Sequence, residues 1–244
     1  GYFVVSINYR LAPKAKMATQ VDDCQFAVAW IKSNADQWQL DTKRFALWGY
    51  SAGAHLVSLM ALQNNQLAMP IRAVVGGGTP ADFSFVPLKS PILKHVFGAT
   101  REKDSEVYLR FSPTNYLRKD SPPFFLFHGD QDFLVPHAVG RKLHDQLVEV
   151  GAESTFFSVR GKGHLMTFLD RNARKKAIAF LDQHLQPGEK QGPAEEIQRD
   201  DDGENSVDSG VNEAADATKA KAGNDARESN KGMLGDGPGE SEGE

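Results

Sequence analysis

Short apolar runs of strand length alternate with longer segments of helical periodicity along most of the chain. The runs that predict strands are Tyr2–Asn8, Phe45–Trp48, Ala73–Gly77, Phe124–His128 and Ser154–Val159. Apolar residues at helical spacing predict helices from Val21 to Ile31, from Ala54 to Leu62, from Leu143 to Val150 and from Ala173 to Leu185. This alternation is typical of an α/β protein in which helices cover a parallel sheet.

The alternation stops between Thr79 and Ser121. That stretch contains several prolines and mixes polar with bulky apolar residues. We interpret residues 79–121 as a cap-like insertion of short helices in one domain that spans residues 1–186.

Composition changes sharply after residue 186. Residues 187–244 carry 16 acidic and 6 basic side chains, a net charge of −10, and no aromatic residue. Residues 1–186 therefore carry a net charge of +6, although the whole chain has −4. A stretch so poor in large apolar residues cannot bury enough surface to offset its loss of chain entropy on folding. We predict an acidic disordered tail over residues 187–244, which is either a solubilising extension or an interaction segment.

A Gly-x-Ser-x-Gly motif, Gly49 to Gly53, lies between a predicted strand and a predicted helix. At such a turn the two glycines are expected to relieve crowding on both sides of a tight bend that presents the serine. The first N–H groups of the helix, that of Ala52 foremost, would point to the place where an oxyanion develops. Ser51 is therefore the candidate nucleophile and Ala52 the candidate oxyanion donor; the alternative is a purely structural turn.

A serine nucleophile needs a base that accepts its proton and a further group that orients the base. His164 follows the last predicted sheet strand and is flanked by small residues, and two aspartates, Asp130 and Asp132, follow the strand before it. Asp130 comes earlier in the loop and is expected to bind main-chain N–H groups there, so we favour Asp132, a choice that rests largely on the family resemblance given below. Ser51, Asp132 and His164 then occur in the order expected for an α/β hydrolase.

Other residues fit structural roles better. His55 lies one turn beyond Ser51 and is expected to pack or to bind a loop, and His128 is expected to fix the loop that holds Asp132. The single cysteine, Cys24, excludes an internal disulfide, and neither a cysteine pair nor a His-x-x-x-His motif supports a metal site. The sequence contains no apolar run of about 18 residues, so we predict no integral membrane segment. We also predict no cofactor and no nucleic-acid partner.

Taken together, these motifs resemble the esterase and lipase branch of the α/β hydrolases related to hormone-sensitive lipase, in particular its feruloyl- and acetyl-esterase-like members. The resemblance covers residues 1 to about 185 and is carried by Asn8–Pro13, Trp48–Leu56, Ser121–Pro123, His128–Pro136 and Gly163–His164. It implies an α/β-hydrolase fold, a mostly parallel sheet with helices on both faces, and a triad of Ser51, Asp132 and His164.

Two features of that family are not found in the chain. The His-Gly-Gly loop, which supplies further oxyanion donors, would precede the first strand, and the family's third strand would lie between Tyr2–Asn8 and Phe45–Trp48. We therefore expect the N-terminal strands to be missing and these two segments to be separated. The chain would then be the C-terminal part of a longer hydrolase, with incomplete activity alone.

The resemblance and the residues together predict a serine hydrolase of small-molecule carboxylic esters with short or medium acyl groups. Ser51 would attack the ester, His164 would take the serine proton, Asp132 would orient His164, and water would release the acyl-enzyme. Two alternatives remain, a serine exopeptidase or amidase on the same fold and a non-catalytic binding protein of hydrolase type. The sequence predicts neither the oligomeric state nor the compartment.

Overall fold

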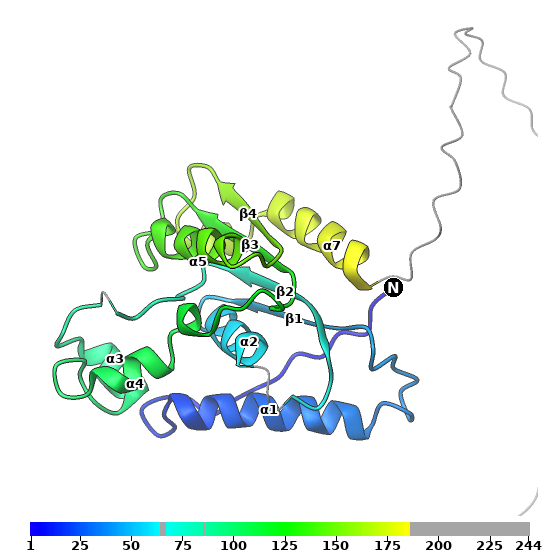
Figure 1. Ribbon diagram of the computed structural model, residues 1–244, viewed down its shortest axis with the longest axis horizontal. Coiled ribbons are helices and arrows are strands. Elements are labelled where there is room, and N and C mark those ends of the chain that lie inside the picture. Colours follow the sequence, from blue (N-terminus) through cyan, green and yellow to red (C-terminus); the bar gives the residue numbers. More distant parts are fainter. Residues whose placement is uncertain (64–66, 85, 186–244) are drawn as a thin grey trace, which may run out of the picture. The chain divides into compact units, whose positions relative to one another are not determined.

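The computed structural model describes residues 1–63, 67–84 and 86–185, so the acidic segment 187–244 lies outside the described residues. Four parallel strands form one sheet in the order β1-β2-β3-β4 (Figure 1). They are β1 (Phe45–Tyr50), β2 (Ile71–Gly77), β3 (Phe124–Gly129) and β4 (Ser154–Val159). Each coincides with a predicted strand to within two residues at either end, so the parallel sheet is confirmed.

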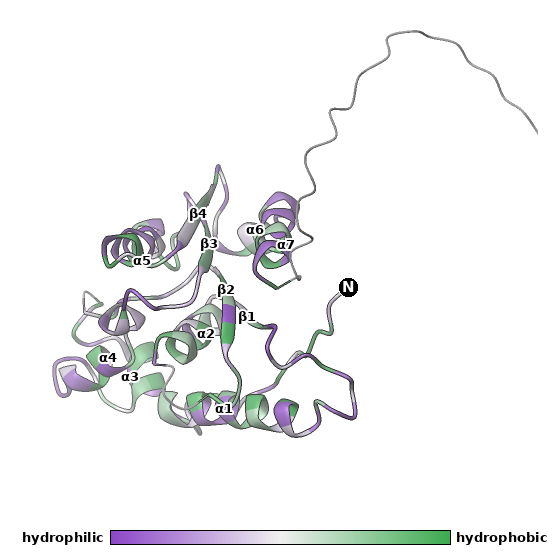
Figure 2. Ribbon diagram, turned by 45° about the vertical axis from the view of Figure 1, so that its right-hand side comes forward, coloured by the Kyte–Doolittle hydropathy of each residue, from purple (hydrophilic) through white to green (hydrophobic). Residues whose placement is uncertain are grey.

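Helices cover both faces of the sheet, as predicted. One face packs against α2 (Ala52–Leu62) and α5 (His137–Glu149), and α1 (Met17–Ser33) packs on α2. The other face is covered by α7 (Arg171–Leu185) (Figure 2). Successive side chains of β3 point to opposite faces of the sheet, because side chains alternate along a strand. Leu126 therefore belongs to the core under α2 and α5, and Phe127 belongs to the core under α7.

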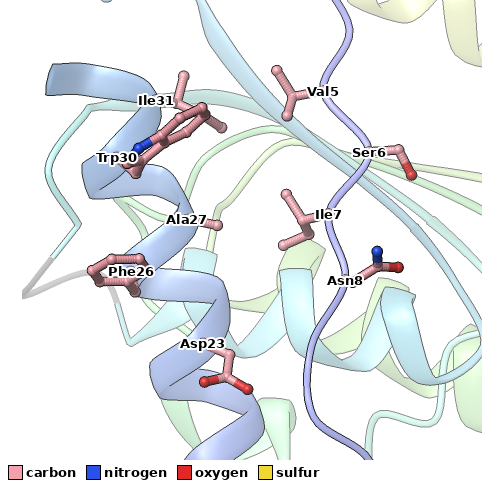
Figure 3. Close-up of a pocket in the computed structure, with 9 residues that line it drawn as sticks. All are labelled: Val5, Ser6, Ile7, Asn8, Asp23, Phe26, Ala27, Trp30 and Ile31. Carbon is pink, nitrogen blue, oxygen red and sulfur yellow. The ribbon is translucent and has the colours of Figure 1, made fainter. Parts of the chain in front are cut away.

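Tyr2–Asn8 is not a strand, and its prediction from the apolar pattern was wrong. A strand is held by main-chain hydrogen bonds to a neighbour, and within the described residues β1 pairs with β2 alone. The separation of this segment from β1, which the family resemblance implied, is therefore observed. The segment instead lies along α1, and the groove between them is lined by Val5, Ile7, Phe26 and Trp30, among others (Figure 3).

Short helices occupy the connection between β2 and β3, where they were predicted. They are α3 (Pro91–Phe97), α4 (Ser105–Arg110) and the 3-10 helix η1 (Pro113–Tyr116). The side chains of Ser90 and Asp104 cap the first two by accepting main-chain N–H groups of the first turn.

Polar contacts attach this connection to the rest of the domain. The imidazole of His55, on α2, is buried, and its Nε2 donates to the main-chain oxygen of Phe111 at 2.7 Å. This is the helix–loop hydrogen bond expected from the sequence. Two further contacts join the Arg118 guanidinium to the main-chain oxygen of Leu62 at 2.6 Å and the Asp82 carboxylate to the Lys142 ammonium at 2.6 Å.

The burial of His55 predicts a loss of stability in acid. Burial lowers the pKa of His55 to about 4, although its bond to the Phe111 carbonyl acts in the opposite direction. In the unfolded chain the imidazole titrates near pH 6.5. As the pH falls from about 6.5 to about 4, the unfolded chain binds a proton that the folded chain excludes. This one group should therefore lower the free energy of unfolding by about 3 kcal/mol over that window.

The variant His55→Gln isolates this effect, because the glutamine amide can still donate to Phe111 but does not titrate. Denaturant unfolding of both proteins, measured from about pH 7 to about pH 4, should give a steeper decline for the wild type. Parallel curves would contradict the assignment.

Candidate functional site

Ser51 lies in a tight turn between β1 and α2, at the carboxyl end of the sheet. Its φ of 52° and ψ of −119° are rare for a residue other than glycine. The Ser51 N–H donates to the main-chain oxygen of Gly77 in β2 at 2.8 Å, and the Ser51 carbonyl accepts the N–H of His55 at 3.0 Å. These bonds fix the turn. Ala52 is the first residue of α2, where N–H groups lack partners within the helix, so the predicted oxyanion donor lies next to Ser51.

The two glycines of the motif are not equivalent. A Cβ atom on Gly49 would lie 2.3 Å from the main chain of Gly53, so only glycine fits at position 49. A Cβ atom on Gly53 would meet no atom within 4 Å in the described structure. The expectation that both glycines relieve crowding was therefore wrong for Gly53. The first turn of α2 presses against Gly49 and leaves open space beside Gly53.

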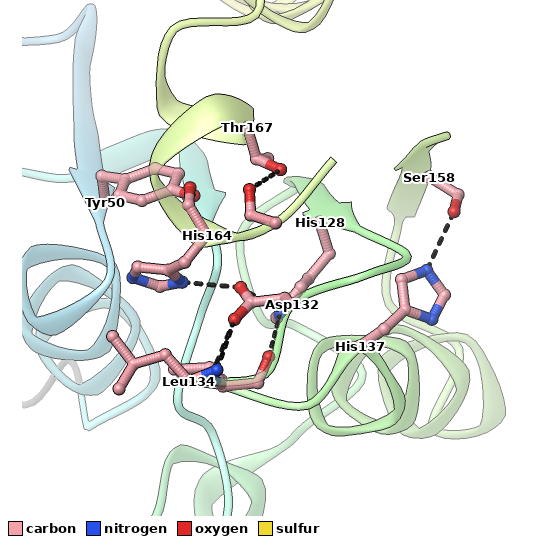
Figure 4. Close-up of polar contacts among 10 residues, drawn as sticks. Tyr50, His128, Asp132, Leu134, His137, Ser158, His164 and Thr167 are labelled. Carbon is pink, nitrogen blue, oxygen red and sulfur yellow. Dashed lines mark hydrogen bonds and ion pairs between the residues drawn. The ribbon is translucent and has the colours of Figure 1, made fainter. Parts of the chain in front are cut away.

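Asp132 and His164 lie side by side at the same edge of the sheet (Figure 4). Asp132 follows β3, and His164 is the first residue of α6 (His164–Phe168), which follows β4. The Nδ1 of His164 donates to the Asp132 Oδ2 at 2.6 Å. The other carboxylate oxygen, Oδ1, accepts the N–H groups of Leu134 at 3.0 Å and Val135 at 2.9 Å. Both oxygens of the carboxylate are thus fixed, and the carboxylate in turn fixes the imidazole.

The hydrogen bond from His164 to the Asp132 carboxylate suits a histidine that acts as a base. Burial would raise the pKa of Asp132, but the hydrogen bonds from His164 and Val135, together with the nearby imidazoles, outweigh it and lower that pKa below the usual carboxyl value. The carboxylate therefore stays ionised and can stabilise an imidazolium at His164. Because Nδ1 donates to the carboxylate, the neutral ring has its lone pair on Nε2, which is the nitrogen that can accept a proton.

Tyr50 connects the Ser51 turn to His164, a contact that the sequence analysis did not foresee. Its hydroxyl donates to the main-chain oxygen of His164, and its ring centroid lies 5.1 Å from that of the imidazole (Figure 4). Burial, reinforced by the charge of Asp132, raises the pKa of Tyr50 to about 12, so the hydroxyl remains a donor. The only signal in the sequence is the position of Tyr50 next to Ser51.

Asp130, the other candidate acid, has a different partner. Its carboxylate accepts the N–H of Gly161 at 2.7 Å and so ties the loop after β3 to the loop after β4. Among the residues with described positions, no group of three or more potential ligands could hold a metal ion. In the same part of the chain, no helix is both long enough and apolar enough to cross a membrane.

Comparisons with known proteins identify the family of this chain. The BD-FAE family model matches residues 1–147. The probable carboxylic ester hydrolase LipM of Mycobacterium tuberculosis is 32% identical over 174 residues, which are 65% of this chain and 40% of LipM. The esterase LipQ of the same organism is 28% identical over 195 residues, which are 73% of this chain and 46% of LipQ. The chain thus spans less than half the length of these curated relatives.

Solved structures of esterases have the same fold. A truncated form of a carbohydrate esterase from gut microbiota superposes with a TM-score of 0.69 at 25% identity. The match covers 75% of this chain and 74% of that one.

Proposed function

Since the chain belongs to the BD-FAE family and has the α/β-hydrolase fold, we propose that the protein hydrolyses carboxylic esters, with Ser51 as nucleophile, His164 as base and Asp132 as the group that orients the base. The observation that carries the proposal is the 2.6 Å hydrogen bond between His164 and a buried, ionised Asp132. Ser51 lies in a strained turn, and its sequence neighbour Tyr50 donates a hydrogen bond to His164. The names of the relatives LipM and LipQ support an ester as the substrate.

The chemistry follows from the protonation states. The Nε2 of His164 accepts the hydroxyl proton as Ser51 attacks the ester carbonyl, and Asp132 stabilises the imidazolium that forms. The Ala52 N–H, reinforced by the dipole of α2, donates to the oxyanion. The imidazolium returns its proton to the leaving alcohol, which leaves an acyl-enzyme. His164 then activates a water molecule that releases the acid.

We propose short or medium acyl groups and a capping role for residues 79–121. Exposed apolar side chains follow Asp132 and His164 in the sequence. Phe133 and Leu134 come directly after Asp132, and Leu165 comes directly after His164. They offer contact to an alkyl group of the substrate.

A chromogenic panel tests the substrate class. Acetyl, butyryl and octanoyl p-nitrophenyl esters are compared with aminoacyl p-nitroanilides, using the longest natural form of the protein that contains these 244 residues. We expect kcat/KM to be highest for the acetyl or butyryl ester. Faster turnover of the octanoyl ester would indicate a medium and not a short acyl group, and faster turnover of the anilides would indicate an exopeptidase or amidase. No turnover of any substrate would indicate a binding protein.

A further inference from the structure

We propose that His128 is a positioning residue, which holds the Asp132 carboxylate in place and thereby keeps His164 in its reactive tautomer. The inference rests on the roles proposed above for Asp132 and His164. His128 lies near the end of β3, and its Nε2 is 2.8 Å from the main-chain oxygen of Val135 and 3.3 Å from the Asp132 Oδ2 (Figure 4).

The partners of His128 define its proton. A main-chain carbonyl can only accept a hydrogen bond, so the Nε2 of His128 carries the ring hydrogen and donates it to Val135, the residue whose own N–H binds the Asp132 Oδ1. Burial is the main reason that the pKa of His128 falls below the usual value for histidine, which keeps the ring neutral. The 3.3 Å approach to the Asp132 Oδ2 is therefore a contact with the N–H edge of a neutral ring and not an ion pair. A neutral ring orients the carboxylate without neutralising the charge that His164 needs.

Each oxygen of the Asp132 carboxylate then has two polar neighbours. Oδ1 accepts two main-chain N–H groups, and Oδ2 accepts the hydrogen bond from His164 and lies 3.3 Å from the Nε2 of His128. The side chains of Asp132 and His128 are 0% and 1% exposed, so bulk water has no access to replace a lost donor. Without His128, Oδ2 would be held by His164 alone, and the same bond would have to fix both the carboxylate and the imidazole.

Gly140, on α5, gives independent evidence that the His128 ring occupies a fixed position. A Cβ atom at Gly140 would lie 2.4 Å from the Nδ1 of His128. Glycine inside a helix is destabilising by about 1 kcal/mol relative to alanine. α5 therefore has glycine, a poor helix former, at the point where the His128 imidazole packs against it. A larger residue at position 140 would displace the ring.

Two substitutions of His128 separate positioning from packing. His128→Phe fills the site but removes the N–H donor, whereas the amide of His128→Gln can replace that donor. We expect kcat to fall about 10- to 100-fold in the phenylalanine variant, the effect of one lost polar contact to a charged group, with little change in KM. The glutamine variant should recover most of kcat. All proteins are compared at a temperature where thermal unfolding shows each to be folded.

Nitrogen NMR of the imidazoles gives a readout that does not depend on activity. In the wild type, His164 should carry its proton on Nδ1; in His128→Phe it should become a mixture of tautomers, and in His128→Gln it should return to Nδ1. An unchanged tautomer and an unchanged kcat in a folded His128→Phe protein would overturn the inference. If the tautomer responds but no ester is turned over even by the wild type, the positioning role stands and the proposed function fails.

Gly140→Ala supplies the matched test. On helix propensity alone the substitution should stabilise α5, but by displacing the imidazole it should lower kcat. In a His128→Ala background the new methyl group meets no ring, and the same substitution should leave kcat unaltered. Equal effects in both backgrounds would show that Gly140 acts independently of His128 and would count against the inference.

Discussion

Replacing Ser51 with alanine should lower ester hydrolysis by about 10⁴-fold or more and should abolish labelling by a fluorophosphonate probe. The reason is that the proposed reaction passes through a covalent bond to the Ser51 oxygen, which no neighbouring group can supply. Removing His164 should have an effect of similar size, because the hydroxyl is a weak nucleophile without a base. The two losses should not add, since both residues act in the same step.

The measurement is the rate of probe labelling followed by location of the labelled peptide. Ser33→Ala is the control, because Ser33 is exposed at the end of α1 and its described partners are local: its hydroxyl donates to the main-chain oxygen of Trp30 and accepts from the side-chain amide of Asn34. Labelling that survives Ser51→Ala, or that occurs on another serine, would eliminate Ser51 as the nucleophile. A folded wild type that neither labels nor turns over any ester would favour the non-catalytic alternative.

Replacing Gly49 with alanine should destabilise the fold by about 4 kcal/mol or more, beyond the usual range for a single substitution. The new methyl group would lie 2.3 Å from the carbonyl carbon and oxygen of Gly53. Main-chain atoms in the first turn of a helix cannot move aside as a flexible side chain can. The change must therefore displace the start of α2 and with it the strained conformation of Ser51.

Gly53→Ala is the matched control in the same motif. It places a methyl group where the described structure has no atom within 4 Å, and alanine favours the helix. Its free energy of unfolding should stay within about 1 kcal/mol of the wild-type value. Denaturant unfolding of the two variants side by side decides the matter, and a Gly53→Ala protein less stable than Gly49→Ala would refute this account of the turn.

The sequence predicted all four strands of the sheet, but it also predicted a strand at Tyr2–Asn8 that does not form. The runs that form β2 and β3 are apolar enough to be buried on both faces, and β4 contains Phe156, Phe157 and Val159 among polar residues, so local composition identifies these strands. Tyr2–Asn8 has an equally apolar pattern, but a strand also needs a partner, and pairing is not a local property. The pattern of this segment therefore indicated a buried strand, whereas its apolar side chains, Phe3 and Val4 among them, are exposed.

The site was predictable at the level of residue types and their order. The contact between Asp132 and His164 could be anticipated because each follows a parallel strand, and the ends of such strands meet at one edge of the sheet. The difference between Gly49 and Gly53 could not, since it depends on the path of α2 after the turn. The contact of Tyr50 with His164 likewise required the position of α6, which no sequence pattern defines.

The polar contacts that attach residues 79–121 to the rest of the domain differ in whether they need a particular side chain at both ends. Those of His55 with Phe111 and of Arg118 with Leu62 end on main-chain carbonyl oxygens, which every amino acid supplies. Among the described residues, only the pair of Asp82 and Lys142 requires two particular side chains. The exposed positions of this segment are therefore free to change, whereas its buried side chains, such as Tyr108 and Phe111, must still fit the core. Grafts from a relative should succeed where these anchors and the buried side chains are copied.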